Sequence, residues 1–93
     1  MNRYFFDLDN GDGLLRDEQG TELQSREFVS REIARILLDV ARDEIPVADR
    51  SVISLVVRDE AGATVSFASL TFNNEWVDDK NSAGMNMRPS DRN

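Results

Sequence analysis

Acidic side chains near the start of the chain are the residues best suited to chemistry. The candidates are Asp7, Asp9, Asp12 and Glu18. Carboxylate oxygens are the ligands that Ca²⁺ and other hard divalent cations prefer. Two carboxylates facing each other across a cleft can also act as acid and base, as in glycoside hydrolysis. The sequence therefore raises two hypotheses for this segment, a cation site and a carboxylate catalyst.

The EF-hand calcium loop is the specific cation site to test. It requires Asp at position 1, Asp or Asn at 3 and 5, Gly at 6 and Glu at 12. Counting from Asp7 puts Gly11 at position 5 and Asp12 at position 6, which reverses the order that the turn needs. Counting from Leu8 puts an apolar residue at position 1 and Gln19 at position 12. Neither register fits, so we expect no metal here, with an irregular divalent-cation site as the alternative.

Catalysis is disfavoured by what the composition lacks. The 93 residues contain no His and no Cys, which removes the commonest general base, the thiolate nucleophile and the commonest zinc ligands. A chain this short also leaves little room for the cleft that a carboxylate pair needs. We therefore expect a protein that is not an enzyme and that carries no cofactor.

The charge of the chain points away from nucleic acid. Eighteen acidic residues oppose eleven basic ones, giving a net charge of −7, whereas affinity for nucleic acid comes mainly from cations that neutralise phosphates. Phe5, Phe67 and Phe72 are then better interpreted as core aromatics than as base-stacking platforms. No segment resembles a signal peptide or a membrane span, so we expect a cytoplasmic protein that binds neither nucleic acid nor membrane.

The first part of the chain has the pattern of a β-hairpin. Residues 3–9 are rich in aromatic residues and alternate in polarity, which is typical of a strand. Asn10-Gly11 and Asp12-Gly13 are strong hairpin turn signals. Residues 14–16 are the candidate returning strand, and residues 21–23 then lead toward a helix.

A helix follows, from about Ser25 to Glu44. Ser25 is a suitable N-cap, Val29, Ile33, Ile36, Leu37 and Val40 form an apolar stripe, and Pro46 ends the helix. A second seam of apolar residues recurs at helical spacing beside that stripe, formed by Ala34, Leu38, Ala41 and Ile45. It favours a contact with a protein partner or with a second copy in a homodimer. The alternative is that the sheet or the segment around Trp76 covers it.

The second hairpin comprises residues 51–59 and 64–72, joined by a turn at residues 60–63. The apolar phase changes from Val65 and Phe67 to Leu70 and Phe72, which predicts a β-bulge or a strand end near residues 68–69. Together these elements predict an α+β fold of order β-β-α-β-β, with one helix packed on a small antiparallel sheet. The order becomes β-α-β-β if residues 14–16 do not pair. Residues 1–77 form the single domain and residues 78–93 a disordered polar tail.

These features resemble a family of short uncharacterised alphaproteobacterial proteins with a domain of unknown function. The resemblance covers about residues 3–72 and rests on Arg3-Tyr4-Phe5-Phe6, the Asp12-Gly13 turn, the segment Arg16 to Leu23 and Val57 to Gly62. It implies the same α+β fold in a bacterial protein and brings no catalytic or binding residue with it.

Two functional hypotheses follow from the sequence. The first is an acidic interaction or adaptor domain that self-associates, or docks a protein partner, through Ala34, Leu38, Ala41 and Ile45. The alternative is a ligand module whose N-terminal acidic loop binds a divalent cation or a basic protein.

Overall fold

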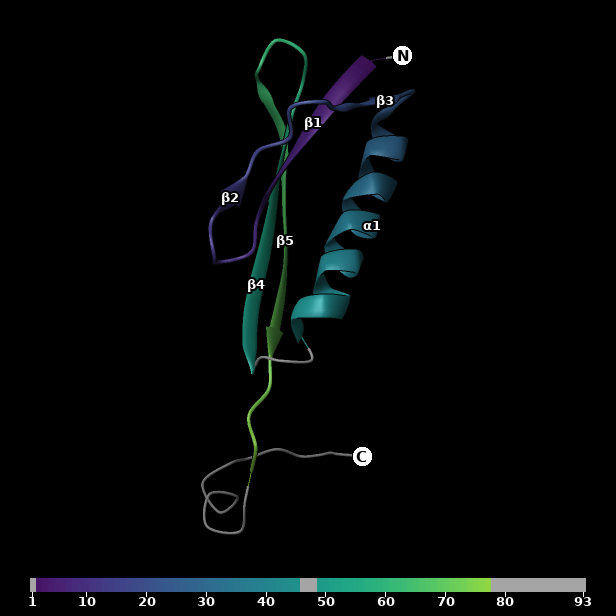
Figure 1. Ribbon diagram of the computed structural model, residues 1–93. Helices are drawn as coiled ribbons and strands as arrows, with labels where there is room; N and C mark the ends of the chain where they lie inside the picture. Colours follow the sequence, from purple (N-terminus) through teal and green to yellow (C-terminus); the bar gives the residue numbers. More distant parts are fainter. Residues whose placement is uncertain (1, 46–48, 78–93) are drawn as a thin grey trace.

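The computed structural model describes residues 2–45 and 49–77, so the predicted tail at 78–93 lies outside the described residues. In chain order the elements are β1 (Asn2–Asp9), β2 (Leu14–Leu15), β3 (Thr21–Leu23), α1 (Arg26–Glu44), β4 (Arg50–Arg58) and β5 (Thr64–Asn73). The α1 helix lies along one face of the antiparallel sheet (Figure 1). The predicted α+β class, with strands before and after a single packed helix, is confirmed.

The sheet has the order β2-β1-β4-β5, and β3 also pairs with β1. The predicted returning strand does form, with Leu15 opposite Leu8. Residues 21–23 form a further short strand that the sequence pattern did not distinguish from a lead into the helix; it pairs with the first half of β1. β1 thus bridges the N-terminal strands and the C-terminal hairpin, through pairs such as Phe6 with Val57.

The α1 helix packs through the predicted stripe. Its buried residues include Val29 and Leu37, and Ile33, Ile36 and Val40 pack around them. The backbone of Ser25 is extended, as an N-cap requires, and its carbonyl accepts the N–H of Val29 at 3.1 Å. The Ser25 hydroxyl, expected to cap the helix, makes no cap hydrogen bond with any described residue. Among the described residues, no helix is long and apolar enough to cross a membrane.

The core lies between α1 and the centre of the sheet. Ile53, Leu55 and Val57 alternate along β4 on the helix side and are at most 1% exposed. Phe6 of β1 completes the layer, with Leu8 and Tyr4 beside it. Because side chains alternate across a strand, the intervening residues of each strand face away from α1, on what is called here the open face of the sheet.

The prediction of a bulge or a strand end near residues 68–69 is wrong. β5 pairs with β4 without interruption from Ser66 to Asn73, and the register shift lies between Val57 and Arg58, opposite Ser66 and Thr64. The change of apolar phase has another cause. Phe67 faces the open side of the sheet, whereas Leu70 and Phe72 face the helix side, so the strand from Ser66 to Asn73 is regular and carries apolar residues on both faces. Val65 lies at the register shift.

Candidate functional site

The β5 strand ends the sheet and carries no charge. Its ten residues, Thr64–Asn73, contain neither a charged side chain nor a proline, in a chain whose residues are 31% charged. The sheet order places β4 on one side of β5 and no described strand on the other. Natural proteins usually blunt a free edge with Lys, Pro or a bulge, because unpaired backbone groups are a template for another strand. Along its regular portion β5 has none of these.

Hydrogen bonds at its two ends fix which backbone groups of β5 face outward. Asn74 N–H donates to Asp49 O at 2.7 Å, and Asp59 N–H donates to Ala63 O at 2.8 Å. Paired residues in an antiparallel ladder alternate between bonded and non-bonded pairs. Counted back from Asn74, which faces β4, the residues of the regular ladder that turn both their N–H and C=O groups away from β4 are Phe67, Ser69, Thr71 and Asn73. Because the N–H of Ser66 faces β4, the carbonyl of Val65 in the same trans peptide group also points outward. Val65 itself lies at the register shift, which is why the Ala63 carbonyl again faces β4.

The open face of β5 is apolar near the start of the strand, next to the hairpin turn. Phe67 is 71% exposed and stands opposite Val56 of β4, with Val65 exposed beside it. The interpretation of Phe67 as a core aromatic is therefore wrong, because its register places it on the face that α1 does not cover. An exposed Phe on a neutral edge strand adds an apolar side chain to the backbone groups that a partner chain could contact.

The helix face of β5 borders a cleft of about 540 Å³. The cleft lies between the first half of α1 and the sheet, and its wall includes Val29, Ile33 and Tyr4. Ser66 and Val65 of β5 also line it. Charged residues line it as well, such as Arg26 at the start of α1 and Glu60 in the turn between β4 and β5. At this level β5 thus contributes a small hydroxyl side chain, Ser66, and the side chain of Val65 at the register shift.

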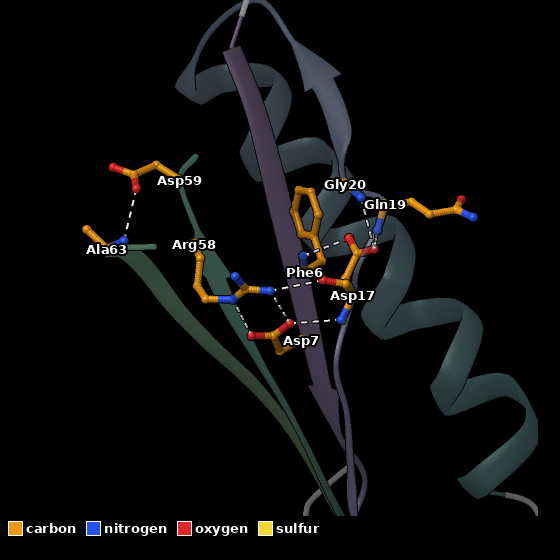
Figure 2. A network of polar contacts seen from close by, with 8 residues as sticks. All are labelled: Phe6, Asp7, Asp17, Gln19, Gly20, Arg58, Asp59 and Ala63. Carbon is orange, nitrogen blue, oxygen red and sulfur yellow. Dashed lines mark hydrogen bonds and ion pairs between the residues drawn. The ribbon is translucent and has the colours of Figure 1, made fainter. Parts of the chain in front are cut away.

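A network of ion pairs and hydrogen bonds braces the other side of the sheet (Figure 2). Arg58 of β4 donates from Nε to Asp7 Oδ2 at 2.7 Å and from Nη2 to Asp7 Oδ1 at 3.1 Å. The same Nη2 donates to the Asp17 carbonyl at 2.9 Å, and the ring of Phe5 lies 5.0 Å from the guanidinium carbon. Asp17 in turn accepts the N–H groups of Phe6, Gln19 and Gly20. The network fastens the loop between β2 and β3 onto β1.

Hydrogen bonds keep the two carboxylates of this network ionised, against the effect of burial. The hydrogen bonds from Arg58 hold the pKa of Asp7 below its ordinary value of 3.8, against the opposing effect of burial. Burial would raise the pKa of Asp17, but backbone N–H donors led by that of Phe6 outweigh it and leave this pKa lowered as well. A general acid or base needs a pKa near the working pH. The geometry therefore indicates a structural brace.

Asp59 sets the turn that begins β5. Its Oδ1 accepts the N–H groups of Ala61 and Ala63, both at 2.9 Å, and the second of these bonds is drawn in Figure 2. The Gly62 N–H donates to Asp59 O at 3.0 Å and closes the loop. The edge strand is therefore fixed at its start by the hairpin.

The helix seam predicted for self-association is not one continuous exposed surface. Ala34 and Leu38 are exposed, Leu38 by 59%, whereas Ala41 is 6% exposed and belongs to the core. Ile45 is half-buried and packs against that core. The structure thus divides the four residues between the solvent and the sheet.

The acidic residues considered as ligands for a cation likewise have different surroundings and do not form one site. Asp7 is buried against Arg58, and Asp9 Oδ1 accepts the Gly11 N–H at 2.9 Å. Asp12 and Glu18 are exposed. Within residues 2–45 and 49–77 no three acidic side chains come together in a group that could hold a metal ion.

Two features escaped the interpretation of the sequence. The Asp7–Arg58 pair joins residues 51 positions apart, and no local pattern indicates it. The free edge had a readable signal, since the chain carries no charged side chain from Ala61 to Asn74. That run stands out in so charged a sequence, but only the strand order shows that it lies at an edge.

The fold and this site define a small two-layer α+β domain with an open, neutral sheet edge. Residues 3–71 match the family described as Domain of unknown function (DUF6894), and the protein belongs to that family. No curated protein and no solved structure matches the chain.

Proposed function

We infer that this protein is a protein-interaction domain, and not an enzyme, which binds another polypeptide by adding a strand to the free edge of β5. The observation that carries this inference is the row of outward N–H and C=O groups from Phe67 to Asn73 on a strand without charge or proline. Main-chain hydrogen bonds supply affinity in this mode of recognition, and pockets for alternate side chains supply selectivity.

The surroundings of the edge support recognition on both faces. An added strand would place its side chains alternately beside Phe67 on the open face and beside Ser66 at the cleft on the helix face. The α1 helix packs mainly over β4, and the cleft lies between its first half and the start of β5. This combination of a backbone template with flanking apolar and recessed surfaces suits a peptide segment better than a small substrate.

The acidic loop is the less favoured candidate for a binding site. Its best ligand, Asp7, is already held by two nitrogen atoms of Arg58, so a cation there would have to displace an ion pair. Asp9 caps its own turn through Gly11. A basic protein partner at this loop would have to bind mainly through Asp12 and Glu18, which are exposed.

Replacing Ser69 by Pro tests the proposed function. The N–H of Ser69 points away from β4, so proline removes one edge donor and leaves the β4–β5 ladder intact. The matched control is Ser54→Pro in β4, whose N–H points to β1 inside the sheet; this variant should unfold. Tagged wild-type and Ser69→Pro proteins are compared by light scattering and by cross-linked affinity capture from host lysate.

We expect Ser69→Pro to keep the circular dichroism spectrum of the wild type and to lose every specific association, with itself or with another protein. If the folded variant retains all associations of the wild type, the edge is not the binding site and the proposed function is wrong.

A further inference from the structure

The residues of β5 are arranged so that the strand complements itself. We propose that the partner is a second copy of this chain, whose β5 pairs antiparallel with β5 about a twofold axis at Ser69, so that Phe72 of each copy enters the cleft of the other. This proposal rests on the proposed function and names the partner of the same edge.

The backbone selects this register. With Ser69 opposite its own counterpart, Phe67 faces Thr71 and Val65 faces Asn73 across the seam. Phe67, Ser69, Thr71 and Asn73 turn both their N–H and C=O groups outward, and Val65 turns its C=O outward. This register therefore pairs Ser69 with its own counterpart, Phe67 with Thr71, and the C=O of Val65 with the N–H of Asn73. A shift of the axis to a neighbouring residue leaves the same end of both β5 strands unpaired.

The side chains on the helix face favour the same register. The pairs across the seam there are Leu70 with Ala68 and Phe72 with Ser66, each a large residue opposite a small one. Ser66 lines the cleft of about 540 Å³ beside Val29 and Ile33. The aromatic ring that the symmetry brings to this level therefore meets a small side chain and an open, partly apolar recess.

Phe72 is an aromatic residue that the monomer core does not use. It is half-buried, and among the described residues it belongs neither to the buried core nor to the half-buried side chains packed against that core. Leu70, two positions earlier on the same face, does pack there. Docking Phe72 into the other copy would remove the exposed part of its ring from water, which is the usual role of an aromatic anchor in an interface.

Charge argues for a second copy over an unrelated strand. The whole protein has a net charge of −7, so two copies repel each other in most orientations. The run from Ala61 to Asn74 contains no charged side chain, so the two paired β5 strands bring only neutral residues opposite each other. A basic peptide, the natural partner of an acidic protein, would find no carboxylate along this strand to pair with.

Single cysteines measure the register directly, because the chain has no cysteine of its own. Directly opposed residues in an antiparallel pair lie about 4.5–5.5 Å apart at Cα, within the range that a disulfide spans. Ser69→Cys should therefore form a disulfide-linked dimer under mild oxidation. The matched control is Ser54→Cys, the residue paired with Ser69 inside the same sheet and one strand from the edge, which should remain monomeric. A mixture of Phe67→Cys and Thr71→Cys should cross-link as a heterodimer more than either variant alone.

Phe72→Ala tests the cleft. We expect it to raise the dimer dissociation constant by about tenfold or more, since truncation of a buried interface aromatic has that effect. Phe28→Ala, the same truncation on the exposed side of α1, should leave the dissociation constant unchanged. Should Phe72→Ala unfold, Phe72 belongs to the monomer core and the cleft assignment is wrong, while the cysteine pairs still decide the register.

The outcomes separate this proposal from the function on which it rests. If the wild-type protein stays monomeric by light scattering at millimolar concentration, the proposal that the partner is a second copy is wrong. The proposed binding at the β5 edge would still be supported in that case if Ser69→Pro abolished binding of another protein. A wild-type dimer in which Ser69→Cys cross-links no better than Ser54→Cys overturns the register. A dimer unaffected by Ser69→Pro overturns both the partner and the proposed function.

Discussion

Arg58 holds Asp7 with two nitrogen atoms across the β1–β4 pair, and the side chains of the two residues are only 13% and 7% exposed. The contact joins the N-terminal half of the chain to the C-terminal hairpin. It also carries the loop around Asp17, whose carbonyl accepts a further bond from Arg58. Three separate segments thus depend on one guanidinium group.

Removal of the carboxylate should therefore destabilise the whole domain. We expect Asp7→Ala to lower the free energy of unfolding by about 3 kcal/mol, the lower end of the range for breaking a buried ion pair. In a domain of this size that corresponds to a fall in Tm of about 12 °C or more. Thermal unfolding followed by circular dichroism measures the change. The control is Asp9→Ala, which changes an exposed residue on the same strand. An equal loss of stability in both variants would show that the ion pair makes no particular contribution to the free energy of unfolding.

Acid should weaken the protein through the same network. The pKa values of Asp7 and Asp17 are lowered in the folded state relative to 3.8, so the folded protein holds its protons less tightly than the unfolded chain. The stability that these groups contribute is complete above that value and is lost as the pH falls through the folded pKa values. We expect Tm to be nearly constant from pH 7 to about pH 5 and to fall below about pH 4. The double variant Asp7→Asn/Asp17→Asn should show a shallower fall; identical slopes would contradict this account.

Gly20 is required for two reasons that a matched pair can separate. Its φ is +75°, and an added Cβ would lie 2.8 Å from Cγ of Arg3 and 2.9 Å from Cε2 of Phe5. Gly62 has a similar φ of +89° but open space around the added atom. Gly62→Ala should cost about 1–2 kcal/mol from backbone strain alone, and Gly20→Ala about 1–3 kcal/mol more from overpacking. Urea unfolding of both variants gives the difference, and equal costs would mean that the contact around Gly20 relaxes freely.

The helix seam can be tested by placing the same charge at two of its positions. Leu38→Glu alters an exposed side chain, so we expect the fold and the association state to be unchanged. Ala41→Glu buries a carboxylate in the core and should unfold the domain. Light scattering and circular dichroism on both variants distinguish the outcomes. If Leu38→Glu stays folded but dissociates a wild-type dimer, the helix and not β5 forms the interface.

Calcium provides a test of the acidic loop. Because Asp7 is engaged by Arg58 and Asp9 by its own turn, we expect no rise in Tm at millimolar Ca²⁺. Differential scanning fluorimetry of the wild type and of Asp12→Asn, with and without Ca²⁺, checks this. A calcium-dependent rise that disappears in Asp12→Asn would restore the cation hypothesis.

Local patterns determined much of this protein. The apolar stripe around Leu37 specifies α1, the alternation along residues 51–59 specifies β4, and the Gly turns set the ends of the hairpins. These signals come from residues close together in the chain, so they can be recognised without knowledge of the tertiary structure. They were sufficient for the α+β class, although they did not separate β3 from the approach to the helix.

The tertiary structure alone decided which surfaces are free. Phe67 and Phe72 look alike in the sequence, but the pairing of β5 with β4 turns Phe67 to the open face and Phe72 to the helix side. Likewise, Ala41 and Leu38 share one seam of the helix, and only the position of the sheet buries the first and exposes the second. Strand order and register are contacts between residues far apart in the chain, and a shift of one residue exchanges the faces of a strand. For that reason the sequence specified the elements, and the assembled sheet specified which edge is left without a neighbouring strand among the described residues.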